Sequence, residues 1–278
     1  MLFALLGALL VGLSLGSLGS GGSILTVPVL TYLVGQPEKV AIAGSLVIVG
    51  GIALVGAITA WRAGKVDLRS VLWFGIPGMV GSFGGAWLGG LVSGTVQLVV
   101  FGALMMVGAW LMLKPMDTSR SAPVSPPRAL IVVEGFLVGI ITGFVGVGGG
   151  FLIVPALGIL GGLSMSRAIG TSLVIIVMKS LAGFAKYQGV LAAQGLELDW
   201  TVIGLFVAVG IAGSLLGQKF GQGLSEVRLR QCFAALLIVV GSGILAQGAW
   251  RLSAADSQAA TRDSAALSQV QMGTSRGA

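Results

Sequence analysis

The sequence predicts an all-α polytopic membrane protein built from two homologous halves. Three observations carry this prediction: 55% of the 278 residues are hydrophobic and 9% are charged, the mean hydropathy is +1.02, and a glycine-rich segment occurs twice. Each charge-free run is about as long as a helix that crosses ~30 Å of hydrocarbon, or slightly shorter. Such a composition excludes a soluble domain. The charge-free runs cover residues 40–61, 71–97, 99–113, 201–218 and 231–250.

Tryptophans support the membrane assignment, because all six lie near the ends of apolar segments, where an amphipathic ring can sit at headgroup depth. The net charge of +7 is scattered over short loops, which favours membrane orientation over a nucleic-acid partner. Histidine is absent, which excludes imidazole-based catalysis or metal binding, and the single cysteine, Cys232, permits no internal disulfide. We therefore expect no cofactor and no metal.

The first part of the chain is repeated in the second. Residues 10–30, LVGLSLGSLGSGGSILTVPVL, align without a gap on residues 137–157, LVGIITGFVGVGGGFLIVPAL. The register continues through AIAGSLVI at residues 41–48 against AIGTSLVI at residues 168–175. This similarity indicates two homologous halves. After a five-residue insertion, the match resumes with Gly78, Gly81, Ser82 and Gly85 against Gly210, Gly213, Ser214 and Gly217.

We assign residues 1–113 to a first membrane repeat and residues 129–250 to a second. Between them, residues 114–128, KPMDTSRSAPVSPPR, are rich in proline and serine and are typical of a solvated linker. Residues 251–278 contain few large apolar side chains, and we expect a disordered tail there.

Counting of basic residues favours inverted repeats over parallel ones. The basic loop at residues 62–69 and the linker can both be cytoplasmic, because two spans separate them. Inversion also places Arg167 and the basic loop at residues 219–230 inside, and leaves Lys39 and Lys186 outside. Parallel repeats would leave the loop at residues 219–230 outside, against the positive-inside rule.

Each half breaks its first apolar region with glycine, in GSGGS at residues 19–23 and GVGGG at residues 146–150. Unsatisfied backbone groups cost several kcal/mol each in hydrocarbon, so irregular backbone persists only where protein or water satisfies it. We expect a long helix and a short half-helix in each half, the short one beginning after Ser23 or at Pro28.

The start of such a half-helix is an anion site that needs no side chain. We therefore expect the two breaks to line a ligand site near the bilayer midplane. Close helix packing is the alternative explanation for the glycines, and we favour it for the four-residue spacings Gly12 and Gly16, and Gly81 and Gly85.

Polar residues at membrane depth are the other candidates. Lys179 lies within an apolar segment and would complement an anion, unless it snorkels to an interface. Glu134 is a candidate for proton coupling, although an interfacial position explains it as well. The hydroxyls of Ser45, Thr171 and Ser172 could bind a ligand or bond back to their own helix. The candidate substrate-binding residues are Ser20, Gly21, Gly22, Ser23, Ser45, Gly148, Gly149, Gly150, Thr171, Ser172 and Lys179.

With its duplicated glycine–proline motif and the TSL element, the sequence resembles the TauE/SafE family of sulfite exporter-like membrane permeases. The resemblance covers about residues 3–250. It implies a multi-spanning transporter for sulfite, sulfonates or related sulfur-containing organic anions. The halves differ, because Ser20 and Ser23 stand where the second half has Val147 and Gly150. The family's signature falls on Gly19, Gly21, Gly22, Pro28, Gly146, Gly148, Gly149, Gly150, Pro155, Thr171 and Ser172.

We expect a secondary transporter for a small anion, in which the two halves rock about the site. An anion channel or passive pore is the alternative. An enzyme is not expected, because titratable groups do not cluster within the apolar segments. The expected location is the bacterial inner membrane, with the lipid bilayer as partner, H+ or Na+ as coupling ion, and homo-oligomerisation left open.

Overall fold

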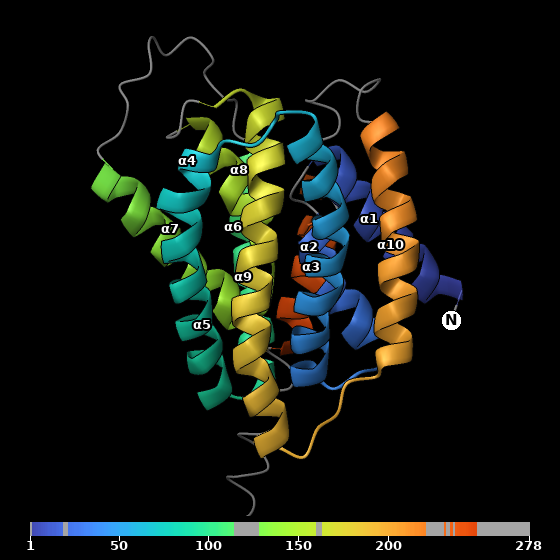
Figure 1. The fold of residues 1–278 in the computed structure, drawn as a ribbon. Helices are drawn as coiled ribbons and strands as arrows, with labels where there is room; N and C mark the ends of the chain where they lie inside the picture. The colour runs from blue at the N-terminus through green and yellow to red at the C-terminus, as the bar shows by residue number, and fades with distance from the viewer. Residues whose placement is uncertain are drawn as a thin grey trace, which may run out of the picture.

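The computed structural model describes residues 2–18, 22–113, 128–159, 163–220, 231, 234–235 and 237–248, and these form a bundle of helices (Figure 1). The described residues do not include Ser20, Gly21 or the predicted tail. Of the predicted linker they include only Arg128. The helices are α1 (Leu2–Leu18), α2 (Gly22–Pro28), η1 (Val29–Leu33), α3 (Glu38–Arg62), α4 (Leu68–Ser70), η2 (Val71–Gly75), α5 (Ile76–Leu91), α6 (Gly94–Leu113), α7 (Arg128–Val145), α8 (Gly150–Ile159), α9 (Met165–Ala193) and α10 (Trp200–Phe220).

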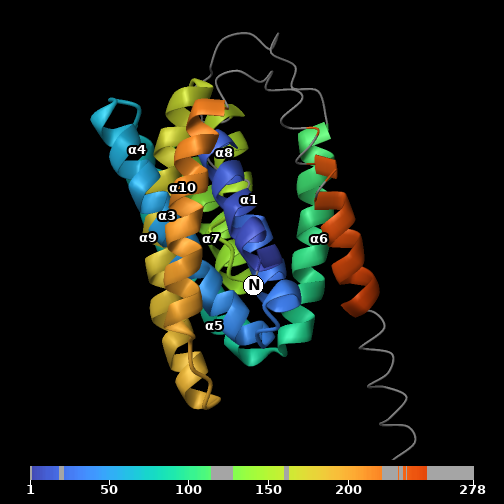
Figure 2. The same cartoon turned by 90° about the vertical axis from the view of Figure 1, so that its right-hand side faces the viewer.

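This architecture confirms the predicted all-α membrane protein. Within the described ranges, four helices are long and apolar enough to cross a membrane, namely Glu38–Arg62, Leu68–Leu91, Ser166–Ala193 and Trp200–Lys219. Shorter apolar helices accompany them, and one of these, Leu237–Gly248, lies beside α6 in Figure 2. Many large apolar side chains are exposed, as expected for helices that contact lipid.

Both predicted breaks are present: Gly22 of α2 lies against the Val11 oxygen of α1, which one continuous helix would not allow, and α7 ends at Val145 before α8. Gly22 and Ser23 already lie within α2, so both predicted starts of the first short helix, after Ser23 and at Pro28, were wrong; α8 starts at Gly150. Pro28 instead lies at the end of α2, where the chain widens into the π-helix η1. Proline supplies no N–H and crowds the carbonyl four residues earlier, so a wider turn accommodates it.

Helices of the first half pack most closely against helices of the second half. The most extensive helix contacts are those of α1 with α10 and of α7 with α5, and each pair joins the first half to the second. Cβ atoms on Gly12 and Gly16 would collide with the carbonyl oxygens of Gly210 and Ser214. The packing interpretation of these glycines is therefore confirmed. The same holds for Gly81 and Gly85, which meet the carbonyl oxygens of Phe136 and Ile140 on α7.

The matched long helices α3 and α9 pack side by side and run in opposite directions (Figure 1). A Cβ on Gly50 would lie 3.1 Å from Cβ of Ser180, and one on Gly170 would lie 3.1 Å from Cβ of Ala60. Residues later in α3 thus contact residues earlier in α9. This is the relation that inverted repeats require, whereas the inversion across a membrane stays a prediction.

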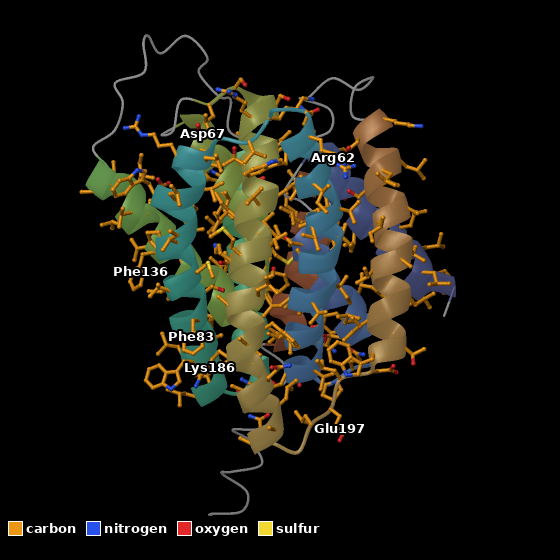
Figure 3. All side chains as sticks on the ribbon, in the orientation of Figure 1. Arg62, Asp67, Phe83, Phe136, Lys186 and Glu197 are labelled. Atoms are coloured by element: carbon orange, nitrogen blue, oxygen red, sulfur yellow. The ribbon has the colours of Figure 1, made fainter. Side chains whose placement is uncertain are left out.

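Basic residues gather at one end of the bundle. Arg62 lies at the end of α3 and Asp67 in the loop that follows, whereas Lys186 and Glu197 lie at the opposite end (Figure 3). We call the first end the basic end and define it by the exposed side chains of Arg62, Lys65, Arg69, Arg167 and Lys219. These are residues that the positive-inside rule assigns to the cytoplasm.

Candidate functional site

The second break begins with a glycine that closes α7. Gly146 has φ +73°, its N–H donates to the Gly143 oxygen at 3.3 Å, and the Val147 N–H donates to the Thr142 oxygen at 2.9 Å. These two bonds with a left-handed glycine form a Schellman motif, which satisfies the last carbonyls of a helix. The helix therefore ends in the interior of the bundle with the Thr142 and Gly143 carbonyl groups paired.

A second left-handed glycine brings the break close to Lys179. Gly149 has φ +74°. A Cβ at this position would collide with the Thr142 side chain, 2.9 Å from its Cβ, and would lie 3.1 Å from the Lys179 ammonium nitrogen. Only glycine fits both this backbone conformation and this space. The break, Thr142 and Lys179 are thus immediate neighbours.

Lys179 is buried, with 1% of its surface exposed, so the alternative that it snorkels to an interface is wrong. It lies in the middle of α9, and a Cβ on Gly78 would lie 3.3 Å from its Cδ. Among the described residues, the ammonium contacts one hydrogen-bond acceptor, the Val138 oxygen, at 3.4 Å. An ammonium has three donors, so this contact leaves it short of partners.

The first amides of α8 lie at the same place. The N–H groups of Leu152 and Ile153 both donate to the Gly149 oxygen, at 3.0 and 3.1 Å, which starts the helix directly after that glycine. The amides before them have no carbonyl partner within the helix. The positive end of α8 and the Lys179 ammonium therefore act together at Gly149, and both favour an anion.

The two breaks approach each other. A Cβ on Gly148 would lie 3.6 Å from Cβ of Ser23 and 2.8 Å from a methyl group of Val49 on α3. Ser23 is the second residue of α2 and is fully buried, as are Gly22 and Gly150. The described part of the first break thus adjoins the second.

The predicted hydroxyl residues serve mainly to hold the backbone. Ser45 donates to the Ile42 oxygen at 2.8 Å and also contacts the Gly146 oxygen, so it ties α3 to the break. Thr171 accepts from the Asp67 N–H at 2.9 Å, near the basic end and about two helical turns from Lys179. Ser172 donates to the Ile169 oxygen at 2.8 Å. The structure therefore brings Ser45 to the break and leaves Thr171 away from it.

A polar network surrounds the end of α7. Lys39 donates to the oxygens of Gly89, of Val92 at 2.7 Å and of the Gln97 side chain at 2.6 Å. The Gln97 amide donates to the Tyr187 hydroxyl at 2.6 Å and to the Phe144 oxygen. The Tyr187 hydroxyl donates to the same Phe144 oxygen at 3.0 Å. Lys39 is thus buried at the start of α3, and Gln97 and Tyr187 extend its network from α5 and α6 to α9 and to the helix before the break.

Replacing Tyr187 with phenylalanine is expected to lower the free energy of unfolding by about 0.5 to 1.5 kcal/mol, because the Phe144 oxygen and the Gln97 amide each lose a partner. Thermal unfolding in detergent measures this change. Ser14→Ala is the control, because that exposed hydroxyl bonds only to its own helix. Equal thermal shifts in the two variants would show that the network adds no stability.

Sequence reasoning missed Thr142, Gln97 and Tyr187. The repeat offered a signal for Thr142, since the matched position of the first half is Leu15. Lys179 likewise matches Ile52, and Ile52 lies against Gly210 as Lys179 lies against Gly78. A polar residue in one half and an apolar residue in the other mark a specialised second break.

Glu134 lies in α7, half-buried, one helical turn before Val138. Its position is thus close in sequence to the carbonyl that contacts Lys179. A role in proton coupling stays a prediction.

Comparison with known proteins agrees with the fold. The model of the family "Sulfite exporter TauE/SafE" matches residues 4–244. A "Probable membrane transporter protein" of Xylella fastidiosa (strain 9a5c) is 35% identical over 250 residues, which cover 87% of this chain and 92% of the relative. A probable membrane transporter protein of Methanocaldococcus jannaschii is 26% identical over 250 residues, covering 84% and 92%. No solved structure matches. The chain therefore belongs to the sulfite exporter TauE/SafE family of membrane transporters.

Proposed function

We propose that this membrane transporter is a secondary permease for a small sulfur-containing anion, such as sulfite or an organic sulfonate, and that the anion binds at the second break. One observation carries the proposal: the Lys179 ammonium is buried beside Gly149, with a single carbonyl oxygen at 3.4 Å as its acceptor among the described residues. A buried charge is expected to have a compensating partner, and an anion would supply it.

The surroundings favour a small oxyanion. Sulfite and sulfonate groups present several acceptor oxygens around one centre, which suits an ammonium together with the amides at the start of α8. Thr142 lies at the same glycine, and its hydroxyl, which now donates to the Val138 oxygen at 2.7 Å, is a further donor that rotation could redirect. The family's description as a sulfite exporter supports the choice of a sulfur oxyanion.

The packing supports transport by rocking of the two halves. Ser23 of the first half meets Gly148 of the second, so a ligand at the second break would lie next to the contact between them. Transporters built from repeats move one repeat or bundle against the other around a central site. In this proposal the protein works without catalysis in the bacterial inner membrane, and H+ or Na+ supplies the coupling.

Uptake into proteoliposomes tests the proposal. Purified protein in liposomes should take up labelled sulfite or methanesulfonate with saturable kinetics, and unlabelled anion inside should accelerate entry of label. Protein-free liposomes are the control. Absence of saturable uptake for both anions by folded protein would contradict a sulfur-anion permease. Uptake without saturation or counterflow would instead indicate a channel.

A further inference from the structure

A groove lies between α3 and α9, on the outside of the bundle. Its volume is about 290 Å³, and its walls are apolar side chains of both helices, among them Leu54, Ile58 and Met178. Trp61 and Arg62 line it toward the basic end. Leu54, Ile58 and Trp61 are each about half exposed, so the groove opens onto the surface that lipid would cover. Figure 1 shows α3 and α9 side by side along this face.

The dimensions of the groove match one leaflet of a bilayer. Leu54 and Arg62 are eight residues apart on one helix, which corresponds to a rise of about 12 Å. Half of the ~30 Å hydrocarbon core is about 15 Å. The groove therefore extends from the headgroup level at Arg62 almost to the midplane, where Met178 immediately precedes Lys179 in the chain.

The chemistry of the groove changes along its length. The deeper part is apolar, whereas the part nearest the surface carries the Arg62 guanidinium, which can bind a phosphate through two parallel hydrogen bonds. Four other cations of the basic end lie at the same end of the bundle, and basic residues at this level attract anionic headgroups by about 1 kcal/mol each. These features fit a molecule with a long apolar tail and an anionic head.

We propose that this groove binds one anionic phospholipid from the leaflet at the basic end, with an acyl chain between α3 and α9 and its phosphate on Arg62. A second copy of this chain fits less well, because a two-fold contact through the groove would bring two Arg62 side chains together. The site bridges the long helices of the two halves, so the lipid contacts both of the units that transport would move.

Native mass spectrometry of the full chain with phosphatidylglycerol tests this site. We expect one tightly retained phosphatidylglycerol, and at least a fivefold weaker affinity in Arg62→Gln. Arg69→Gln is the matched control, because Arg69 is exposed at the same end but does not line the groove. Equal losses in the two variants would indicate general attraction to the basic end and would overturn the proposal, as would full retention in Arg62→Gln.

Tryptophan fluorescence provides a second test, which detects contact between Trp61 and the lipid and does not require a variant with weakened lipid binding. A variant that keeps Trp61 as its sole tryptophan should be quenched at least twofold more by dibrominated phosphatidylglycerol than by dibrominated phosphatidylcholine. A matched variant that keeps only Trp73, which is exposed outside the groove, should show no such preference. Equal preference at both positions overturns the lipid site. Shielding of Trp61 from both lipids in a dimeric protein also overturns it, in favour of a second copy.

Discussion

Replacement of Lys179 by methionine is expected to reduce kcat/KM for anion uptake by about 10- to 150-fold while the protein stays folded. Hydrogen bonds to charged groups contribute about 1.5 to 3 kcal/mol, and each 1.4 kcal/mol corresponds to a factor of ten. Methionine keeps the unbranched stem that passes Gly78. Since a lysine at the centre of a membrane helix costs about 2.5 to 3.5 kcal/mol, its loss should leave the unfolding temperature in detergent unchanged or higher.

Lys186→Met is the matched control for this variant. Lys186 lies about two turns further along α9, is partly exposed, and has its ammonium nitrogen 5.7 Å from the centre of the Phe83 ring. Figure 3 shows Lys186 and Phe83 toward the end of the bundle opposite Arg62. Its uptake should stay within about twofold of the unmodified protein, since a surface cation–π contact contributes only about 0.5 to 1 kcal/mol. Full uptake by Lys179→Met would show that the buried ammonium has no role in binding the transported anion.

Replacement of Gly149 by alanine is expected to lower the free energy of unfolding by about 2 to 5 kcal/mol and to abolish uptake. A left-handed conformation costs an L-residue about 1 to 2 kcal/mol, and overpacking costs about 1 to 3 kcal/mol more. The new methyl group would press on Thr142 and approach the Lys179 nitrogen at 3.1 Å. Thermal unfolding and the uptake assay measure the two effects.

Two other glycines separate the cost of the left-handed conformation from the cost of overpacking. Gly195 has φ +62° with no atom within 4 Å of an added Cβ, so Gly195→Ala should show only the conformational cost. Gly84 is helical and also has open space, so Gly84→Ala should be neutral or stabilising. If Gly149→Ala and Gly195→Ala lose equal stability and both transport, the close contact at the break has no role.

Much of the fold was predictable because it follows from hydropathy and from repetition. Charge-free runs predicted three of the four candidate spans of the described residues, and the glycine segments predicted both breaks. The first residue of each short helix was less predictable. Serine caps and proline starts are general preferences of helix N-termini, whereas buried Gly22 and Gly150 already lie in these helices, where tertiary contacts decide.

The site was predictable only where a residue is unusual in itself. Lys179 stood out because a charge at membrane depth is expensive, and the structure places it at the second break. The hydrogen bonds of Lys39 were not predictable, because its partners, Gly89, Val92 and Gln97, lie 50 or more residues away in the chain. No local pattern contains such contacts. Thr171 was likewise explained only by its bond to the distant Asp67.

The close packing of first-half helices against second-half helices has a consequence for biosynthesis. The packing partner of α1 is α10, which begins at Trp200. At about 5 to 20 residues per second, a ribosome needs roughly 10 to 40 s to reach that helix. During this interval the glycine face of α1 has only lipid, the translocon or a chaperone to cover it. The nascent first half must therefore remain an open intermediate until the final helices emerge.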